Sequence, residues 1–207
     1  MAATCCTRCS TFIITTGLTA LFLWLSLRVD EPKCYLEYIY VPALNNTLKS
    51  HRNATVFFSL KLANPNKDKG VKYDAVGVSF RVFVSANATR PLGNATIERF
   101  YQGHQKTAHK SGSLLAGGNL TAPVDGKVYY RVDFATAAKY KILLWYTKRD
   151  RLWGGANVEI GNSGLKVNRK AIRLGNSPIV IESGAHKLPP CYRALVAFFF
   201  AVLMLIG

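Results

Sequence analysis

Short runs of alternating apolar and polar residues fill the stretch from 32 to 182, and they constrain the fold more than any other feature. Successive side chains of a β-strand point to opposite faces, so each run predicts a strand with one buried face. The clearest runs cover residues 35–41, 54–62, 73–84, 127–134 and 139–146, and weaker candidates cover 97–101, 156–160, 166–174 and 178–181. The turn signals NPNKDKG, RPLGN, PVDG and GNSG separate them. The pattern predicts an all-β, immunoglobulin/fibronectin-III-like β-sandwich over residues 32–182.

An uncharged apolar stretch, STFIITTGLTALFLWLSL, lies between Arg8 and Arg28. Its length and composition predict a membrane-inserting helix over residues 10–28, with residues 1–9 as a cytosolic stub. The small residues that mark a signal-peptidase site are missing, because Trp24 stands two positions before Ser26. An uncleaved signal anchor is therefore favoured over a cleaved signal peptide.

The C-terminal stretch 194–207 is apolar throughout, yet as a helix it would reach only about 21 Å, which is less than the roughly 30 Å core of a bilayer. Before it stand the small residues Ser183, Gly184 and Ala185, followed by a spacer that contains two prolines. This layout predicts a glycosylphosphatidylinositol attachment signal over 183–207, removed after Ser183. A short anchor that stays in place, or a buried terminal core element, are the alternatives.

Asparagine sequons indicate the compartment of the predicted sandwich. Five Asn-x-Ser/Thr sequences without an intervening proline begin at Asn45, Asn53, Asn87, Asn94 and Asn119. N-glycosylation takes place in the secretory lumen, so these sites predict an extracellular sandwich at the plasma membrane.

The cysteines fit this topology. Three of them, Cys5, Cys6 and Cys9, precede the apolar stretch and are palmitoylation candidates. Zinc is not expected there, because no second pair of ligands lies nearby. Cys34 and Cys191 could form a disulfide if the tail is retained, whereas removal of the tail would leave Cys34 unpaired.

The formal net charge of +16 predicts a polyanionic partner, which could be nucleic acid, anionic lipid or acidic polysaccharide. Besides the membrane itself, an extracellular domain favours acidic cell-wall polysaccharide, and we do not expect nucleic acid to bind. The alternative is a basic surface that serves solubility alone. The candidate basic clusters are Lys67, Lys69 and Lys72; Lys148, Arg149 and Arg151; and Lys166, Arg169 and Lys170.

Catalysis and cofactors are not expected. The four histidines, His51, His104, His109 and His186, have no GxSxG, HExxH or paired-cysteine context, and no glycine-rich phosphate loop precedes a helix. His104 and His109 are placed in one solvated loop.

The string LANPNKDKGVKYD, residues 62–74, reads physically as a hairpin connection, with Gly70 allowing a positive φ. It also resembles the Asn-Pro-Asn signature of the plant harpin-induced-like family of the late-embryogenesis-abundant group 2 superfamily. The strings CCTRCSTFIITTGLTALFLWLSLR, KCYLEYIYVPAL and RFYQGHQKTAHKSG are similar to the disease-resistance branch of that family. The resemblance marks as motif residues Asn64, Pro65, Asn66, Gly70, Tyr73 and Asp74.

This resemblance implies a β-sandwich of about seven strands, a plasma-membrane location and a non-enzymatic role upstream of coiled-coil intracellular immune receptors. It further implies a cytosolic immune regulator as partner of the N-terminal stub, and a part in adhesion between plasma membrane and cell wall. Some relatives carry an Asn-Gly-Asp tripeptide where this chain has residues 161–164, GNSG, so integrin-type adhesion is not expected here. An abiotic-stress protective protein and a polysaccharide-binding module are the alternative functions.

Overall fold

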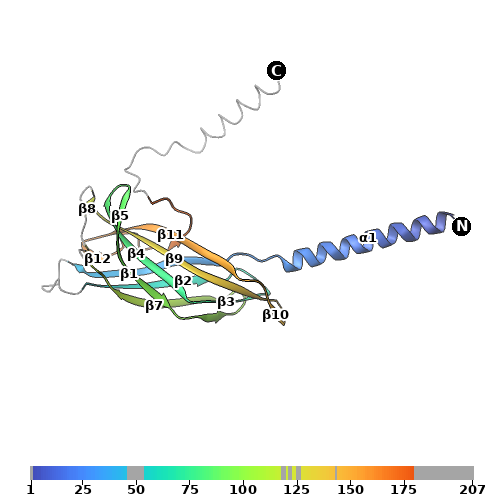
Figure 1. Cartoon of the computed structure of the whole chain (residues 1–207), viewed down its shortest axis with the longest axis horizontal. Coiled ribbons are helices and arrows are strands. Elements are labelled where there is room, and N and C mark those ends of the chain that lie inside the picture. Colours follow the sequence, from blue (N-terminus) through green and yellow to red (C-terminus); the bar gives the residue numbers. More distant parts are fainter. Residues whose placement is uncertain are drawn as a thin grey trace, which may run out of the picture.

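The structure is a computed structural model that describes residues 2–45, 54–117, 120, 123–124, 127–142 and 144–179. Within these residues lie one helix, α1 (Ala2–Leu27), and a β domain formed by two antiparallel sheets. Figure 1 shows α1 projecting from one end of the β domain, roughly along its long axis. We call this end of the domain the helix end.

The first sheet has the order β12-β1-β2-β7, and β13 also pairs with β1. Its strands are β1 (Lys33–Asn45), β2 (Thr55–Ala63), β7 (Thr107–Leu115), β12 (Ser163–Leu165) and β13 (Ile172–Leu174). The second sheet has the order β5-β4-β9-β3-β6, and three further strands pair with β9. Its strands are β3 (Gly70–Tyr73), β4 (Val76–Ser85), β5 (Ala88–Ile97), β6 (Phe100–Gln102), β8 (Pro123–Val124), β9 (Lys127–Ile142), β10 (Trp145–Tyr146) and β11 (Asp150–Ile160).

The core lies between the two sheets. Alternate residues of β1, β2 and β4 are buried while their neighbours are more exposed, which is the strand pattern that the sequence predicted. Phe58 of β2 packs against Phe80 of β4 across the core, with ring centroids 5.0 Å apart. The prediction of an all-β fold with two packed sheets is therefore confirmed.

Strand boundaries differ from the prediction in two ways. Residues 127–134 and 139–146 were expected as separate strands, but β9 runs unbroken to Ile142, because its small central residues keep pairing with β11. Residues 73–84 were expected as one strand, but the chain breaks after Tyr73, and pairing with β9 resumes at Gly77 opposite Ala135. Together with added short strands, this gives thirteen strands within the described residues rather than about seven.

Two predicted turns and loops are strands. RPLGN, residues 90–94, lies inside β5, where Gly93 has φ 158° and the pairing with β4 is irregular. His109 was expected in a loop but lies in β7, which pairs with β2 along its whole length. Of the expected strand at 178–181, the described residues 178 and 179 are not in a strand.

The glycines of β11 hold the C-terminal part of the β domain against the second sheet. Gly155 exchanges two backbone hydrogen bonds with Gly175, of 2.8 and 3.2 Å. A side chain at Gly154 would meet the carbonyl oxygen of Leu174 at 2.7 Å. Gly154 is therefore required where Leu174 of β13 passes close to β11, whereas a side chain at Gly155 would meet the side chains of Arg131 and Asp133 on β9.

The helix predicted for residues 10–28 is confirmed as a helix, and it begins earlier, at Ala2. Its predicted membrane-spanning character is not confirmed, since no helix among the described residues is both long and apolar enough to cross a membrane. Cys5, Cys6 and Cys9 belong to α1, but their side chains lie outside the described residues, as does the predicted signal at 183–207 with Ser183 and Cys191.

Candidate functional site

Four segments meet at the helix end of the sandwich. Lys33 at the start of β1 pairs with Ala63 at the end of β2, so the linker from α1 and the loop 64–69 leave the first sheet together. Gly70 pairs with Lys141, and Val71 pairs with Gln102. This register brings the turn 103–106 and the tip between β9 and β10 to the same end (Figure 1).

Asn64 is the centre of a buried hydrogen-bond network at this end. Its side chain is 3% exposed, and its Nδ2 donates to the carbonyl oxygens of Lys69 at 2.8 Å and Gly103 at 3.0 Å. Its Oδ1 accepts from the backbone N–H and from the Nδ2 of Asn66, at 3.1 and 2.8 Å. One side chain thus satisfies polar groups of the loop and of the β6–β7 turn, which stay buried at low cost.

Asn66 ties the linker to the sandwich. Its Nδ2 donates to the carbonyl oxygen of Asp30 at 2.7 Å, and its Oδ1 accepts from the backbone N–H of Asp30 at 2.9 Å. The side-chain amide of Asn66 therefore bonds both the N–H and the C=O of Asp30, as the backbone of a neighbouring strand would. Because Asn66 is 4% exposed and also bonded to Asn64, it fixes where the chain leaves α1. We call Asp30, Asn64 and Asn66 the clamp.

Gln102 completes the network, although no sequence pattern had marked it as a candidate residue. It is 3% exposed, and its Nε2 donates to the carbonyl oxygens of Leu62 and Lys106. The backbone N–H of Asn64 donates to the same Lys106 carbonyl at 3.1 Å, and that of Gln105 donates to the Asn66 carbonyl at 3.0 Å. Gln105 has φ 51°, so this tight turn holds a non-glycine residue in the left-handed region.

The loop 64–69 is not the hairpin connection that the sequence predicted. It leaves β2 in the first sheet and enters β3 in the second, so it crosses between the sheets. The positive φ expected at Gly70 is also absent. Glycine is required at position 70 for another reason, because the ring of Tyr101 occupies the space that a side chain there would need.

The last two motif residues support the second sheet beside the clamp. Tyr73 is fully buried and stacks on Phe100 at 4.7 Å, and burial raises the pKa of its phenol. Asp74 donates its backbone N–H to Ala137 at 2.8 Å and pairs through its carboxylate with Arg149 at 3.2 Å. The motif residues therefore act as one structural unit at the helix end.

In two of the three predicted basic clusters, one lysine is buried. Lys69 is 4% exposed, and its Nζ pairs with Asp68 at 2.9 Å. Lys166 is 9% exposed, its Nζ donates to the Lys170 carbonyl at 2.8 Å, and loss of solvation lowers its pKa. Lys148 and Arg151 remain exposed, whereas Arg149 is engaged with Asp74.

The sequons differ in exposure. Asn87 lies exposed in the turn between β4 and β5, and Asn94 is exposed on β5. Asn45 is half-buried at the end of β1, and its Nδ2 donates to the hydroxyl of Tyr40 at 3.1 Å. Asn53 and Asn119 lie outside the described residues.

We expect Asn87 to carry a glycan more completely than Asn45, because the glycan is attached through the amide nitrogen and that of Asn45 is engaged. The substitution Asn87→Gln should increase the gel mobility of protein from plant cells by one glycan, and site-resolved mass spectrometry should show lower occupancy at Asn45. Equal occupancy at both sites would contradict this ranking.

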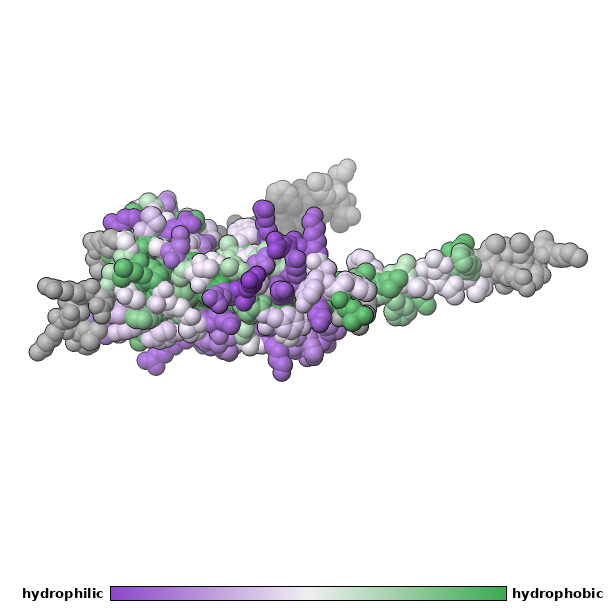
Figure 2. All heavy atoms as spheres, turned by 60° about the horizontal axis from the view of Figure 1, so that its bottom comes forward, coloured by the Kyte–Doolittle hydropathy of each residue, from purple (hydrophilic) through white to green (hydrophobic). Residues whose placement is uncertain are grey.

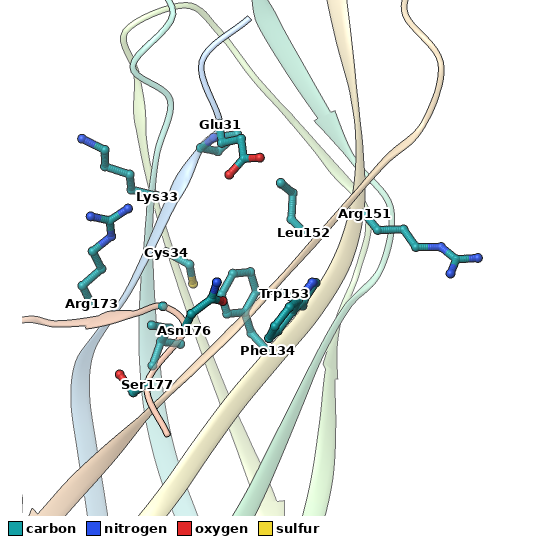
Figure 3. Close-up of a pocket in the computed structure, with 13 residues that line it drawn as sticks. Glu31, Lys33, Cys34, Phe134, Arg151, Leu152, Trp153, Arg173, Asn176 and Ser177 are labelled. Atoms are coloured by element: carbon teal, nitrogen blue, oxygen red, sulfur yellow. The ribbon is translucent and has the colours of Figure 1, made fainter. Parts of the chain in front are cut away.

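Cys34 lines a cavity of about 620 Å³ formed by the linker, β1, β9, β11, β13 and the residues that follow β13. Figure 3 shows its thiol facing the rings of Phe134 and Trp153, while Arg151 and Arg173 extend outward. Cys34 is 3% exposed, and burial raises its pKa to about 12. Its predicted partner, Cys191, lies outside the described residues.

We expect Cys34 to resist alkylation in the folded protein. At pH 8 a thiol with a pKa near 12 is thiolate only in about one molecule in ten thousand, and burial blocks access as well. Iodoacetamide labelling followed by peptide mass mapping should leave Cys34 unmodified until denaturant is added. Labelling under native conditions as fast as that of an unfolded control would contradict the buried thiol.

Among the described residues, no group of three or more His, Cys, Asp and Glu side chains could hold a metal ion. His109 pairs with Glu37 at 2.7 Å on the exposed side of the first sheet, and His104 lies exposed in the β6–β7 turn. The two histidines were expected to share a loop, but the structure places one in a strand and the other in a turn.

With an exposed apolar helix that the clamp ties to a two-sheet β domain, the chain is a helix-tethered β-sandwich protein. No family model matches the chain. Protein NDR1 from Arabidopsis thaliana is 41% identical to it over 181 residues, which cover 84% of this chain and 83% of that protein. The chain belongs to the NDR1/HIN1-like family, which confirms the resemblance noted from the sequence.

Proposed function

We propose that this protein is a non-enzymatic plasma-membrane component of plant disease-resistance signalling, acting upstream of coiled-coil intracellular immune receptors. The observation that carries the proposal is the 41% identity to Protein NDR1 across most of both chains. The family resemblance implies a role in disease resistance and association with the plasma membrane. The clamp supports a close link between helix and sandwich, since Asn66 holds the backbone of Asp30, three residues after the end of α1.

Membrane attachment through α1 is supported by the exposed side chains of the helix. Phe12, Phe22 and Trp24 are 71%, 64% and 62% exposed. Figure 2 shows the described part of α1 standing clear of the sandwich and without strongly hydrophilic residues. Such a surface is unfavourable in water and favourable in the apolar part of a bilayer.

The orientation we propose places residues 1–9 in the cytosol and the sandwich outside the cell. The exposed sequons at Asn87 and Asn94 support this, because N-glycosylation is a lumenal reaction. In this orientation Cys5, Cys6 and Cys9 are available for palmitoylation, and the stub reaches a cytosolic immune regulator. We further propose glycosylphosphatidylinositol attachment at Ser183, whose test is altered detergent partitioning after phosphatidylinositol-specific phospholipase C.

A role in adhesion to the cell wall would use the exposed basic residues that remain, among them Lys148 and Arg151. De-esterified pectin is a polyanion, and we expect weak binding that is lost when salt is added, because exposed charges are screened beyond about 10 Å at 0.1 M salt. Neutral glucan is the matched control ligand. Equal binding to both polysaccharides would contradict an electrostatic wall contact.

The proposal is tested in plants that lack the gene. Mutant plants, and the same plants complemented with the full chain, are challenged with bacteria carrying defined effectors and, separately, with drought. We expect resistance to be lost in the mutant and restored by the wild-type chain. A drought defect with intact resistance would instead favour a stress-protective function, as the superfamily name suggests.

A further inference from the structure

The tip between β9 and β10 exposes large apolar side chains that nothing else in the described protein covers. Leu144 is 92% exposed, Trp145 is 56% exposed and Tyr146 is 45% exposed. Polar residues are enough to form a hairpin turn, so folding does not require large apolar side chains here. Their burial against a partner would be favourable. We call these three residues the tip.

The tip lies at the helix end of the sandwich. Lys141 pairs with Gly70 at the start of β3, and Ile142 pairs with Trp145, so the tip extends beyond the sheet on the side of loop 64–69. Figure 1 shows β10 at the end from which α1 leaves. A membrane that holds α1 would therefore lie next to the tip.

Basic side chains surround the tip. Lys72 lies with its Nζ 5.8 Å from the ring of Tyr146, and Arg149 pairs with Asp74. The exposed basic residues at this end include Arg28, Lys67, Lys106, Lys141 and Lys148. The exposed acidic residues there include Asp30, Glu31 and Asp150. Figure 2 shows apolar and strongly hydrophilic residues side by side at this end of the sandwich.

We propose that the tip is a second membrane-contact site, which inserts Leu144, Trp145 and Tyr146 into the interface of a bilayer with anionic headgroups. Trp and Tyr favour this interface because their rings combine an apolar body with a polar edge, and the neighbouring lysines attract anionic lipid. With the clamp fixing the linker, α1 and the tip hold the sandwich at two points. The inference rests on the proposed membrane attachment of α1.

The three tryptophans of the chain provide the test. Trp24 lies on α1, Trp145 in the tip, and Trp153 is 67% exposed on β11. Trp153 pairs with Ala135, seven residues along β9 from Ile142, which is roughly 23 Å at about 3.3 Å per residue. Trp153 is therefore a matched control, at least as exposed as Trp145 but separated from the tip along the sheet.

Three full-length variants, each retaining one tryptophan and carrying Phe at the other two positions, are reconstituted into phosphatidylcholine vesicles with and without an anionic phospholipid. Acyl-brominated lipid should quench Trp145 by about half and shift its emission to shorter wavelength, since interfacial rings lie next to the acyl chains. Trp153 should stay unquenched. The anionic lipid should increase the quenching of Trp145, and Leu144→Asp should abolish it without affecting Trp24.

The outcomes separate the inference from the proposed function. If Trp24 is quenched but Trp145 is quenched no more than Trp153, the tip contact is wrong and α1 still lies in the membrane. Quenching of Trp145 without Trp24 would support the tip and contradict attachment through α1. If neither is quenched, both are wrong.

Discussion

Replacing Leu21 and Leu25 together by arginine is expected to release the protein from membranes. Both side chains are 50% exposed, and their spacing of four residues places them on one face of α1. Arginine in the middle of a membrane-embedded helix costs about 2.5 to 3.5 kcal/mol, and the arginine at position 25 adds less because it lies two residues before the end of α1, where its side chain can reach the interface. Partitioning should fall by roughly a hundred-fold, since every 1.4 kcal/mol is a factor of ten. The measurement is the fraction that stays in an alkali-washed membrane pellet.

The matched control is the double substitution Leu21→Ile with Leu25→Ile, which keeps the apolar surface and should keep the protein in the pellet. A further arm distinguishes the two proposed anchors. If the arginine variant stays in the pellet until phosphatidylinositol-specific phospholipase C is added, the anchor at Ser183 holds the chain. If it stays in the pellet regardless of the lipase, a third attachment such as palmitate on Cys5, Cys6 or Cys9 holds the chain, and the apolar face of α1 is not required for membrane attachment.

The alternation of apolar and polar residues in the sequence predicted those strands that have one buried and one exposed face. In β2 and β4 the pattern of buried and exposed residues is nearly regular, so the apolar period was visible in the sequence. In β7 only Leu114 is buried, and the remaining positions are half-buried or exposed. Such a strand forms because its backbone completes the hydrogen-bond ladder of β2, and its side chains carry no sign of this.

The candidate site was predictable as a motif but not as a structure. Asn64 and Asn66 were identified by their resemblance to a family signature, and local physics suggested a hairpin. Their hydrogen bonds instead join residues 36 and 39 positions apart in the chain. Gln102, whose side-chain amide bonds to Leu62 from 40 residues away, carried no local signal either. Contacts of this range depend on the packing of both sheets, which the sequence pattern of one segment does not encode.

The same limit applies to the charges. A count of lysines predicted basic patches at 67–72 and at 166–170, but each contains one lysine that folding buries. The Nζ of Lys166 lies between two backbone carbonyl oxygens, that of Leu36 in β1 at 3.4 Å and that of Lys170 at 2.8 Å. A positive charge in such a place stabilises local structure and is not available to a partner.

Asn64→Ala is expected to destabilise the sandwich more than any other single polar substitution at the helix end. It removes two donors from the buried carbonyls of Lys69 and Gly103 and one acceptor from Asn66. A buried polar group left without a partner costs about 1 to 3 kcal/mol, so the free energy of unfolding should fall by about 3 to 5 kcal/mol. Denaturant unfolding of the full chain in detergent, followed by near-ultraviolet circular dichroism, measures this.

Two further variants show whether the donors of Asn64 are responsible. Asn64→Asp preserves size and the acceptor oxygen but replaces the donating Nδ2 by an oxygen that faces two carbonyls, so it should destabilise at least as much as Asn64→Ala. Asn162→Ala changes an exposed asparagine in the turn before β12 and should alter stability by less than about 0.5 kcal/mol. If Asn64→Asp were as stable as the wild type, the network would not depend on the Asn64 amide donors, and the two hydrogen bonds between Asn66 and Asp30 would hold the linker without them.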